Sequence, residues 1–124
     1  MDIQNIDRVP AFRTKDGSEI RELLAHRNSA IRNQSLAEAR LPEGAGTIPH
    51  LHPQTEEIYY ILEGEAEMII ADERQSVGVG DAIAIPPGIV HQIVNRGVGT
   101  LKFICCCAPA YEDADTVMLE GGTT

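Results

Sequence analysis

The sequence lacks three features that would point to common functional classes: an excess of basic residues, a long apolar run and a spaced set of cysteines. Lys and Arg total 10 against 19 Asp and Glu, a formal net charge of −9, so phosphate backbones and anionic membrane surfaces would be repelled. No stretch approaches the roughly 18 apolar residues of a membrane span, and the start, MDIQNIDRVP, lacks the basic residues and apolar run of a signal peptide. These absences predict a soluble cytoplasmic protein that binds neither nucleic acid nor membrane.

The three cysteines form one block, Cys105, Cys106 and Cys107. Neighbouring cysteines form a disulfide only with strain, and residues two apart on a strand lie near the upper distance limit for one. We therefore expect reduced thiols, as in a reducing compartment.

Apolar periodicity along the chain is mostly that of short strands, and no long helical pattern competes with it. Turn-forming residues separate the strands, at 42–46, 63–65, 78–81, 86–88 and 96–99. The predicted strands are 19–24, 30–41, 47–52, 57–62, 65–71, 74–77, 82–85, 91–95 and 101–107.

Many short strands at close spacing predict an all-β fold, an antiparallel sandwich or barrel with jelly-roll connections. The 124 residues suit one domain, which we expect to span residues 1–124 without a linker or repeat. An N-terminal arm leads into the first strand, and an acidic tail ends in Gly-Gly-Thr-Thr. Such arms often cover an edge strand, either of their own sheet or of a partner's.

Three histidines and a glutamate could meet in such a fold. His50 and His52 are two residues apart in a predicted strand, so both imidazoles would face the same side. Glu57 would face the other side of one unbroken strand, but Pro53 donates no ladder hydrogen bond, and a bend or bulge there can reset the alternation. His91 begins a later strand, and a closed barrel would bring it to the first pair from across the interior.

Three imidazoles and one carboxylate suit a divalent first-row metal and would leave about two positions open on an octahedral ion. Taken singly, these signals are ambiguous. A lone His-x-His pair is more often incidental than a metal site, and a lone His91 is more often a polar residue at a strand end.

Two longer patterns include all four residues. Residues 44–64 match G-x5-H-x-H-x4-E-x6-G, and residues 80–95 match G-x5-P-x-G-x2-H-x3-N. These patterns resemble the two motifs of the cupin superfamily, and the spacer between them is similar to that of small single-domain microbial cupins. The resemblance covers residues 44–95 and implies the cupin jelly-roll β-barrel. The matching positions are Gly44, His50, His52, Glu57, Gly64, Gly80, Pro86, Gly88, His91 and Asn95.

The resemblance also implies a ligand set for one divalent transition metal ion per chain, which would be Fe, Mn, Zn, Ni, Co or Cu. By resemblance, the ligands are His50, His52, Glu57 and His91. Some cupins have a shorter spacing before their glutamate, which would select Glu56. Only Glu57 leaves six residues before Gly64, so it is the preferred ligand, and Glu56 would point outwards.

Strand alternation predicts the wall of a substrate pocket. If Lys102 faces solvent, Phe103 and Cys105 face the interior, and small cupins place this strand near the metal. Tyr59 and Cys105 are candidates for catalysis, although both could be packing residues. The predicted pocket residues are Ala37, Ala39, Tyr59, Ile61, Ile93, Phe103 and Cys105. For the strand before the first motif, the sequence leaves open the alternative that Glu38 and Arg40 face inwards instead.

The resemblance favours a metal-dependent enzyme that acts on a small organic molecule. With Fe or Mn we expect an oxygenase, a dioxygenase first, and with Zn or Ni an isomerase, lyase or cyclase. The alternative is a non-catalytic module that binds a sugar or another small metabolite. Segments 19–24 and 115–119 could pair with a second copy, which predicts a homodimer.

Overall fold

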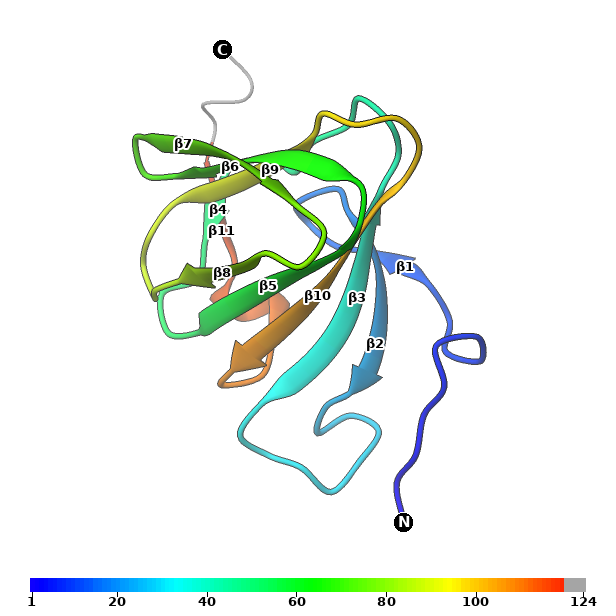
Figure 1. Ribbon diagram of the computed structural model, residues 1–124. Helices are drawn as coiled ribbons and strands as arrows, with labels where there is room; N and C mark the ends of the chain where they lie inside the picture. Colours follow the sequence, from blue (N-terminus) through cyan, green and yellow to red (C-terminus); the bar gives the residue numbers. More distant parts are fainter. Residues whose placement is uncertain (120–124) are drawn as a thin grey trace.

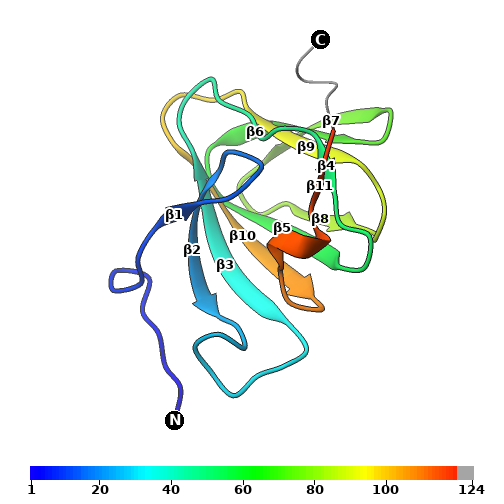
Figure 2. The ribbon, with the colours of Figure 1, turned by 180° about the vertical axis from the view of Figure 1, so that it is seen from behind.

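Two antiparallel sheets pack face to face in the computed structural model of the chain, which describes residues 1–119 (Figures 1 and 2). The six-stranded sheet has the order β1-β2-β3-β10-β5-β8, and the five-stranded sheet has the order β11-β4-β9-β6-β7. The fold is therefore the predicted all-β jelly roll. The strands are β1 (Phe12–Arg13), β2 (Glu19–Leu24), β3 (Ser35–Leu41), β4 (His50–Leu51), β5 (Glu56–Glu63), β6 (Glu65–Ile70), β7 (Glu73–Gly78), β8 (Ala82–Ile85), β9 (His91–Asn95), β10 (Leu101–Ala108) and β11 (Val117–Met118).

Alternation of side chains determines which residues reach the space between the sheets. In β10 every second residue is buried, beginning with Leu101, and in β5 burial alternates from Glu57 to Ile61. The inward side chains build one core, in which Phe103, Ile61 and Ile93 are at most 1% exposed. Burial of this apolar surface is the main stabilising contribution to such a fold.

Two segments differ from the predicted strands. Residues 30–34 lie outside any strand, because Arg32, Asn33 and Gln34 are exposed and provide no buried side of a sheet. The predicted strand 47–52 is reduced to β4, since Pro49 and Pro53 flank it and neither has an N–H to donate to a ladder.

The chain ends also form two strands that were not predicted, β1 and β11. β11 follows the short 3-10 turn η1 (Asp113–Asp115) and pairs with β4 of the same chain. The C-terminal arm therefore covers an edge of its own sheet, one of the two alternatives considered. The terminal Gly-Gly-Thr-Thr lies outside the described residues. No helix within residues 1–119 is long and apolar enough to cross a membrane.

Candidate metal centre

Three histidines converge between the two sheets. His50 lies in β4 and His91 begins β9, and these two residues pair directly across the antiparallel ladder. His52 follows β4 immediately and points to the same side. All three are buried, at 1%, 4% and 1% exposure for His50, His52 and His91, and each offers a ligand atom within 4.8 Å of the other two. These three residues could hold a metal ion.

Hydrogen bonds at Nδ1 orient each imidazole. The Nδ1 of His50 lies 2.7 Å from the carbonyl of Ile48, and that of His91 lies 3.2 Å from the carbonyl of Ile89. The Nδ1 of His52 lies 3.3 Å from the carbonyl of Asp115. A carbonyl can only accept, so Nδ1 carries the proton and Nε2 keeps a lone pair. This is the arrangement by which proteins prepare histidines for metal binding.

Glu57 is the fourth predicted ligand, and it approaches from the opposite sheet. Residues 52–55 interrupt the strand and carry the chain from β4 to β5, so the alternation restarts and Glu57 points inwards, while Glu56 is exposed. Its Oε1 lies 3.5 Å from Nε2 of His52 and 3.6 Å from Nε2 of His91. Two ligands of one tetrahedral ion lie about 3.4 Å apart. The spacing therefore suits ligands of a shared metal better than a hydrogen bond.

Two buried atoms at this centre have no hydrogen-bond partner among residues 1–119, namely Oε1 of Glu57 and Nε2 of His91. Leaving a buried polar atom unpaired costs about 1–3 kcal/mol, and more for a charged group. A cation between them would satisfy both atoms.

Charge at the centre also favours a cation. Burial raises the pKa of Glu57, but the protonated imidazoles of His52 and His91 lower it more strongly, to about 2, and Glu57 in turn raises the pKa of His52 against the effect of burial. A metal ion would take the place of these protons. Glu57 is therefore a carboxylate at neutral pH. Burial lowers the pKa of His50, and the neighbouring His91 lowers it further, which keeps the His50 imidazole neutral and available as a ligand.

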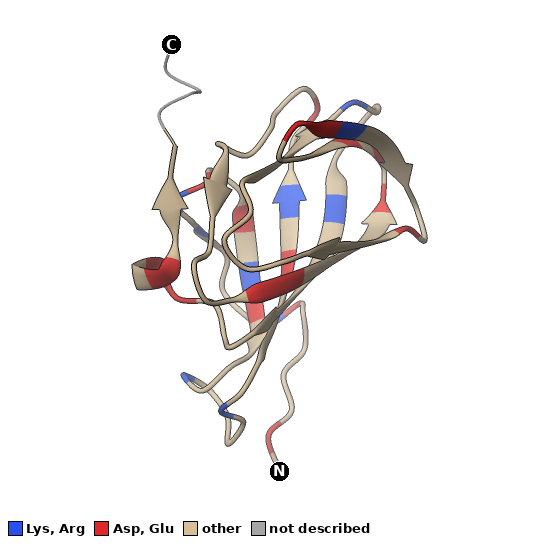
Figure 3. Cartoon of the chain, turned by 90° about the vertical axis from the view of Figure 1, so that its left-hand side faces the viewer, with Lys and Arg blue, Asp and Glu red and all other residues tan. Residues whose placement is uncertain are grey.

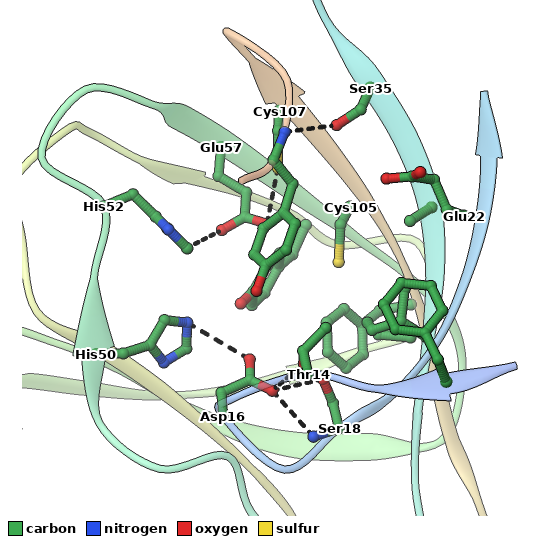
Figure 4. A pocket seen from close by; sticks show the side chains of 17 residues that line it. Thr14, Asp16, Ser18, Glu22, Ser35, His50, His52, Glu57, Cys105 and Cys107 are labelled. Atoms are coloured by element: carbon green, nitrogen blue, oxygen red, sulfur yellow. Dashed lines mark hydrogen bonds and ion pairs between the residues drawn. The ribbon is translucent and has the colours of Figure 1, made fainter. Parts of the chain in front are cut away.

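A cavity of about 30 Å³ adjoins the centre, with room for about two water molecules. Of the predicted pocket residues, Ala37, Ala39, Tyr59, Phe103 and Cys105 line it, whereas Ile61 and Ile93 lie in the core and are not among its lining residues. Glu38 and Arg40 form an ion pair with each other and do not line the cavity. Figure 4 shows His50, His52 and Glu57 at one side of this cavity and Cys105 beside it.

The "Cupin domain" family profile matches residues 37–107 of this chain. The protein belongs to the cupin family. It is 47% identical over 114 residues to an uncharacterized protein of Methanocaldococcus jannaschii, MJ1618, a match that covers 92% of this chain and 91% of the relative.

Solved structures of other cupins share the fold. The polyketide cyclase RemF from Streptomyces resistomycificus is 27% identical with a TM-score of 0.75, and the match covers 87% of this chain and 79% of that one. A predicted oxalate decarboxylase from Thermotoga maritima is 24% identical with a TM-score of 0.76 and covers 86% and 98% of the respective chains.

This cupin places further polar residues around the cavity that sequence reasoning missed. Cys107 donates to Oε2 of Glu57 at 3.2 Å, because the two residues are paired across β10 and β5. Asp16, in the turn before β2, places Oδ2 3.5 Å from Nε2 of His50. The alternation that places Phe103 and Cys105 inwards also places Cys107 inwards, although its contact with Glu57 was not predicted, whereas only an Asp-Gly turn marks Asp16 in the sequence.

Proposed function

We propose that this cupin is a metal-dependent enzyme that acts on a small organic molecule, with one divalent transition metal ion per chain. The unpaired buried atoms of Glu57 and His91 carry this proposal, because a cation held also by His50 and His52 would satisfy them. When bound, a first-row metal in such a site supplies Lewis-acid or dioxygen chemistry.

Two side chains of the cavity wall, those of Tyr59 and Cys105, could bind a substrate, and their protonation decides what each can do. Burial raises the pKa of Tyr59 well above its ordinary value, so its hydroxyl keeps its proton and can donate to a ligand. Burial also raises the pKa of Cys105 well above the ordinary value. Cys105 is therefore a neutral thiol in the cavity wall, and Tyr59 is the better catalytic candidate of the two.

The reaction we favour is an oxygenase reaction, with isomerase, lyase or cyclase chemistry second. Proteins of similar structure are named as a polyketide cyclase and a predicted oxalate decarboxylase, which supports catalysis on small molecules. Free thiols at three consecutive positions favour a reducing compartment such as the cytoplasm.

Elemental analysis followed by activity assays tests the proposal. The metal-free protein is reloaded separately with Fe(II), Mn(II), Zn(II) and Ni(II), and oxygen uptake and product formation are followed with phenols, diketones and sugar phosphates. Turnover with one metal and one substrate class supports an enzyme. Tight binding of a metabolite without turnover under any metal would instead favour a non-catalytic binding module.

A further inference from the structure

The two oxygens of the Glu57 carboxylate have different surroundings. Oε2 accepts a hydrogen bond from the thiol of Cys107 at 3.2 Å, whereas Oε1 has no hydrogen-bond partner among residues 1–119. Oε1 is the oxygen that faces the histidines, 3.5 Å from Nε2 of His52 and 3.6 Å from Nε2 of His91. Figure 4 shows Glu57 between His52 and Cys107. The thiol and the proposed metal ion would therefore each take one oxygen.

The pairing of three neighbouring strands fixes this arrangement. β10 lies between β3 and β5 in the six-stranded sheet, so Cys107 is level with Ser35 of β3 on one side and with Glu57 of β5 on the other. All three side chains line the cavity. Residues directly opposite one another in antiparallel strands hold their side chains close together on the same face. The contact between Cys107 and Glu57 is therefore set by the backbone register.

The surroundings of Cys107 keep its thiol in place as a donor. Ser35, Glu57 and Cys107 are all buried, so water does not compete for the carboxylate. The hydroxyl oxygen of Ser35 accepts from the N–H of Tyr111 at 3.0 Å, which ties β3 to the segment that follows β10. Burial and the neighbouring carboxylate of Glu57 raise the pKa of Cys107 well above its ordinary value, so the thiol keeps its proton.

The other proposed ligands each have a comparable partner. Nδ1 of His50 and Nδ1 of His91 face backbone carbonyls two residues earlier, and Nδ1 of His52 faces the carbonyl of Asp115. Asp115 ends the acidic turn η1, which is red near the C-terminal end of the chain in Figure 3. Partners of this kind orient the ligands, and losing one typically lowers metal affinity by about 10–100-fold. Cys107 holds the corresponding position behind Glu57.

We propose that Cys107 is a positioning residue of the metal site: its S–H donates to Oε2 of Glu57 and leaves Oε1 alone to bind the ion. This inference rests on the proposed function, because it concerns a ligand of the same centre. A carboxylate binds a metal through one oxygen or through both. Without the thiol, Oε2 would be free to bind as the second oxygen and would occupy a position that a substrate needs.

Metal binding by two variants of Cys107 tests the proposal. Cys107→Ala removes the donor and should weaken Co(II) binding about tenfold to a hundredfold, as measured by competition with a chromophoric chelator. Cys107→Ser keeps an O–H donor and should recover most of that loss. The visible absorption of Co(II) should change in Cys107→Ala, because a second carboxylate oxygen alters the coordination, and it should return to the wild-type form in Cys107→Ser.

Cys106→Ala is the control for removal of a sulfur from the same strand. Cys106 is partly exposed and level with Ile58, on the other face of β10 from the cavity. Its removal should leave the Co(II) affinity and spectrum at their wild-type values. Circular dichroism and thermal unfolding of each variant identify any loss of metal that comes from the fold.

The hydrogen bond itself can be measured in the metal-free protein by infrared spectroscopy. The S–H stretching band of Cys107, identified by its loss in Cys107→Ser, should lie at a lower frequency than those of Cys105 and Cys106, because a carboxylate is a strong acceptor. In Glu57→Gln this band should move to higher frequency. A Cys107 band at the frequency of the other two, or one that does not move in Glu57→Gln, would overturn the proposal.

Three results with Co(II) would also contradict it. A wild-type affinity and spectrum in Cys107→Ala would mean that the thiol has no effect on Glu57. Equal losses in Cys107→Ala and Cys107→Ser would mean that the sulfur only fills space. An intense near-ultraviolet band from thiolate to cobalt that disappears in Cys107→Ser would make Cys107 a ligand itself.

Failure of the proposed function has a different signature. If the wild-type protein takes up no divalent metal, the metal site itself is wrong, and the role of Cys107 toward the ion falls with it even where the infrared shifts show the hydrogen bond. If the wild-type protein binds Co(II) and Cys107→Ala binds it equally well, the metal site stands and only the role of Cys107 is wrong.

Discussion

At the scale of single residues, the proposed metal centre depends on which nitrogen of each imidazole faces the interior. Backbone carbonyls accept from Nδ1 of His50, His52 and His91, and all three Nε2 atoms are left for a ligand role. The carboxylate of Glu57, the fourth predicted ligand, approaches them from the opposite sheet. Glu56, its neighbour, points to solvent.

This pair of glutamates allows a matched test. Glu57→Gln is expected to weaken metal binding at least tenfold, because a neutral amide replaces a buried carboxylate ligand. Glu56→Gln should leave the affinity unchanged. Competition with a chromophoric chelator measures both. Equal metal affinities of the two variants would mean that Glu57 is not a ligand. If only Glu56→Gln loses metal affinity, Glu56 is the ligand, as the shorter spacing after His52 would require.

The cysteines provide a second test at this scale. Cys105 and Cys107 are buried and line the cavity, whereas Cys106 is partly exposed on the other face of β10. Burial keeps Cys105 protonated by raising its pKa, but Fe(II) loading in air should still oxidise it before Cys106, because oxidants formed at the centre reach the interior first. Iodoacetamide applied from solution should instead modify Cys106 first.

Mass spectrometry of the three thiols distinguishes these outcomes. Oxidation of Cys106 first, or equal oxidation of all three, would mean that the metal does not lie beside this strand. The alkylation experiment serves as the control for ordinary solvent access.

The convergence of His50, His52 and His91 could be predicted from the sequence, because the resemblance to the cupin motifs specifies their spacing. Asp16 could not, since only the packing of the β1–β2 turn against the segment before His50 brings it to the cavity. A single Asp-Gly pair predicts a turn and says nothing about what the turn faces.

At the scale of strands and turns, Gly64 joins β5 to β6 with a positive φ of 96°. A Cβ at this position would lie 3.2 Å from Cα of Leu101 and 3.3 Å from the carbonyl oxygen of Thr100. Gly64→Ala should therefore lower the free energy of unfolding by about 1–3 kcal/mol.

Urea denaturation measures this change, with Gly78→Ala as the control. Gly78 ends β7 with no positive φ, and an added Cβ there meets no atom within 4 Å. Its free energy of unfolding should stay the same or rise by up to about 1 kcal/mol. Similar losses in both variants would contradict the role assigned to the Gly64 turn.

The strand predictions were correct where buried and exposed residues alternate over several positions. β5, β9 and β10 each bury every second residue over at least four positions. β1 and β11 contain two residues each, too few to show a period, and they exist only because a neighbouring strand offers free hydrogen-bonding groups. Such pairing depends on the tertiary fold and leaves little trace in the sequence.

At the scale of the whole molecule, the outward face of β5 in the six-stranded sheet is apolar and exposed. Ile58, Tyr60 and Leu62 alternate with the inward residues of β5 and are 50%, 44% and 41% exposed. Of the segments first considered for pairing with a second copy, β2 pairs with β1 only through Glu19 and Ile20, and β11 is an edge strand of its sheet. We expect a dimer to use the outward face of β5, because it exposes large apolar side chains.

Light scattering at micromolar concentration tests that prediction. We expect twice the 13.5 kDa mass of one chain. Tyr60→Glu should shift the protein to monomers by placing a charge in the interface, while Val98→Glu, at a loop position that is 93% exposed, should remain dimeric. A monomeric wild-type protein would rule out the dimer under these conditions.

The most direct test of the metal centre is the metal content of the purified protein. We expect close to one divalent transition metal ion per chain in the wild-type protein and almost none after His52→Ala and His91→Ala are combined. His26→Ala is the control, because His26 is the fourth histidine and pairs with Glu112 at the surface. Full metal occupancy in the folded double variant would contradict the assignment, and its loss with retention in His26→Ala is the result predicted here.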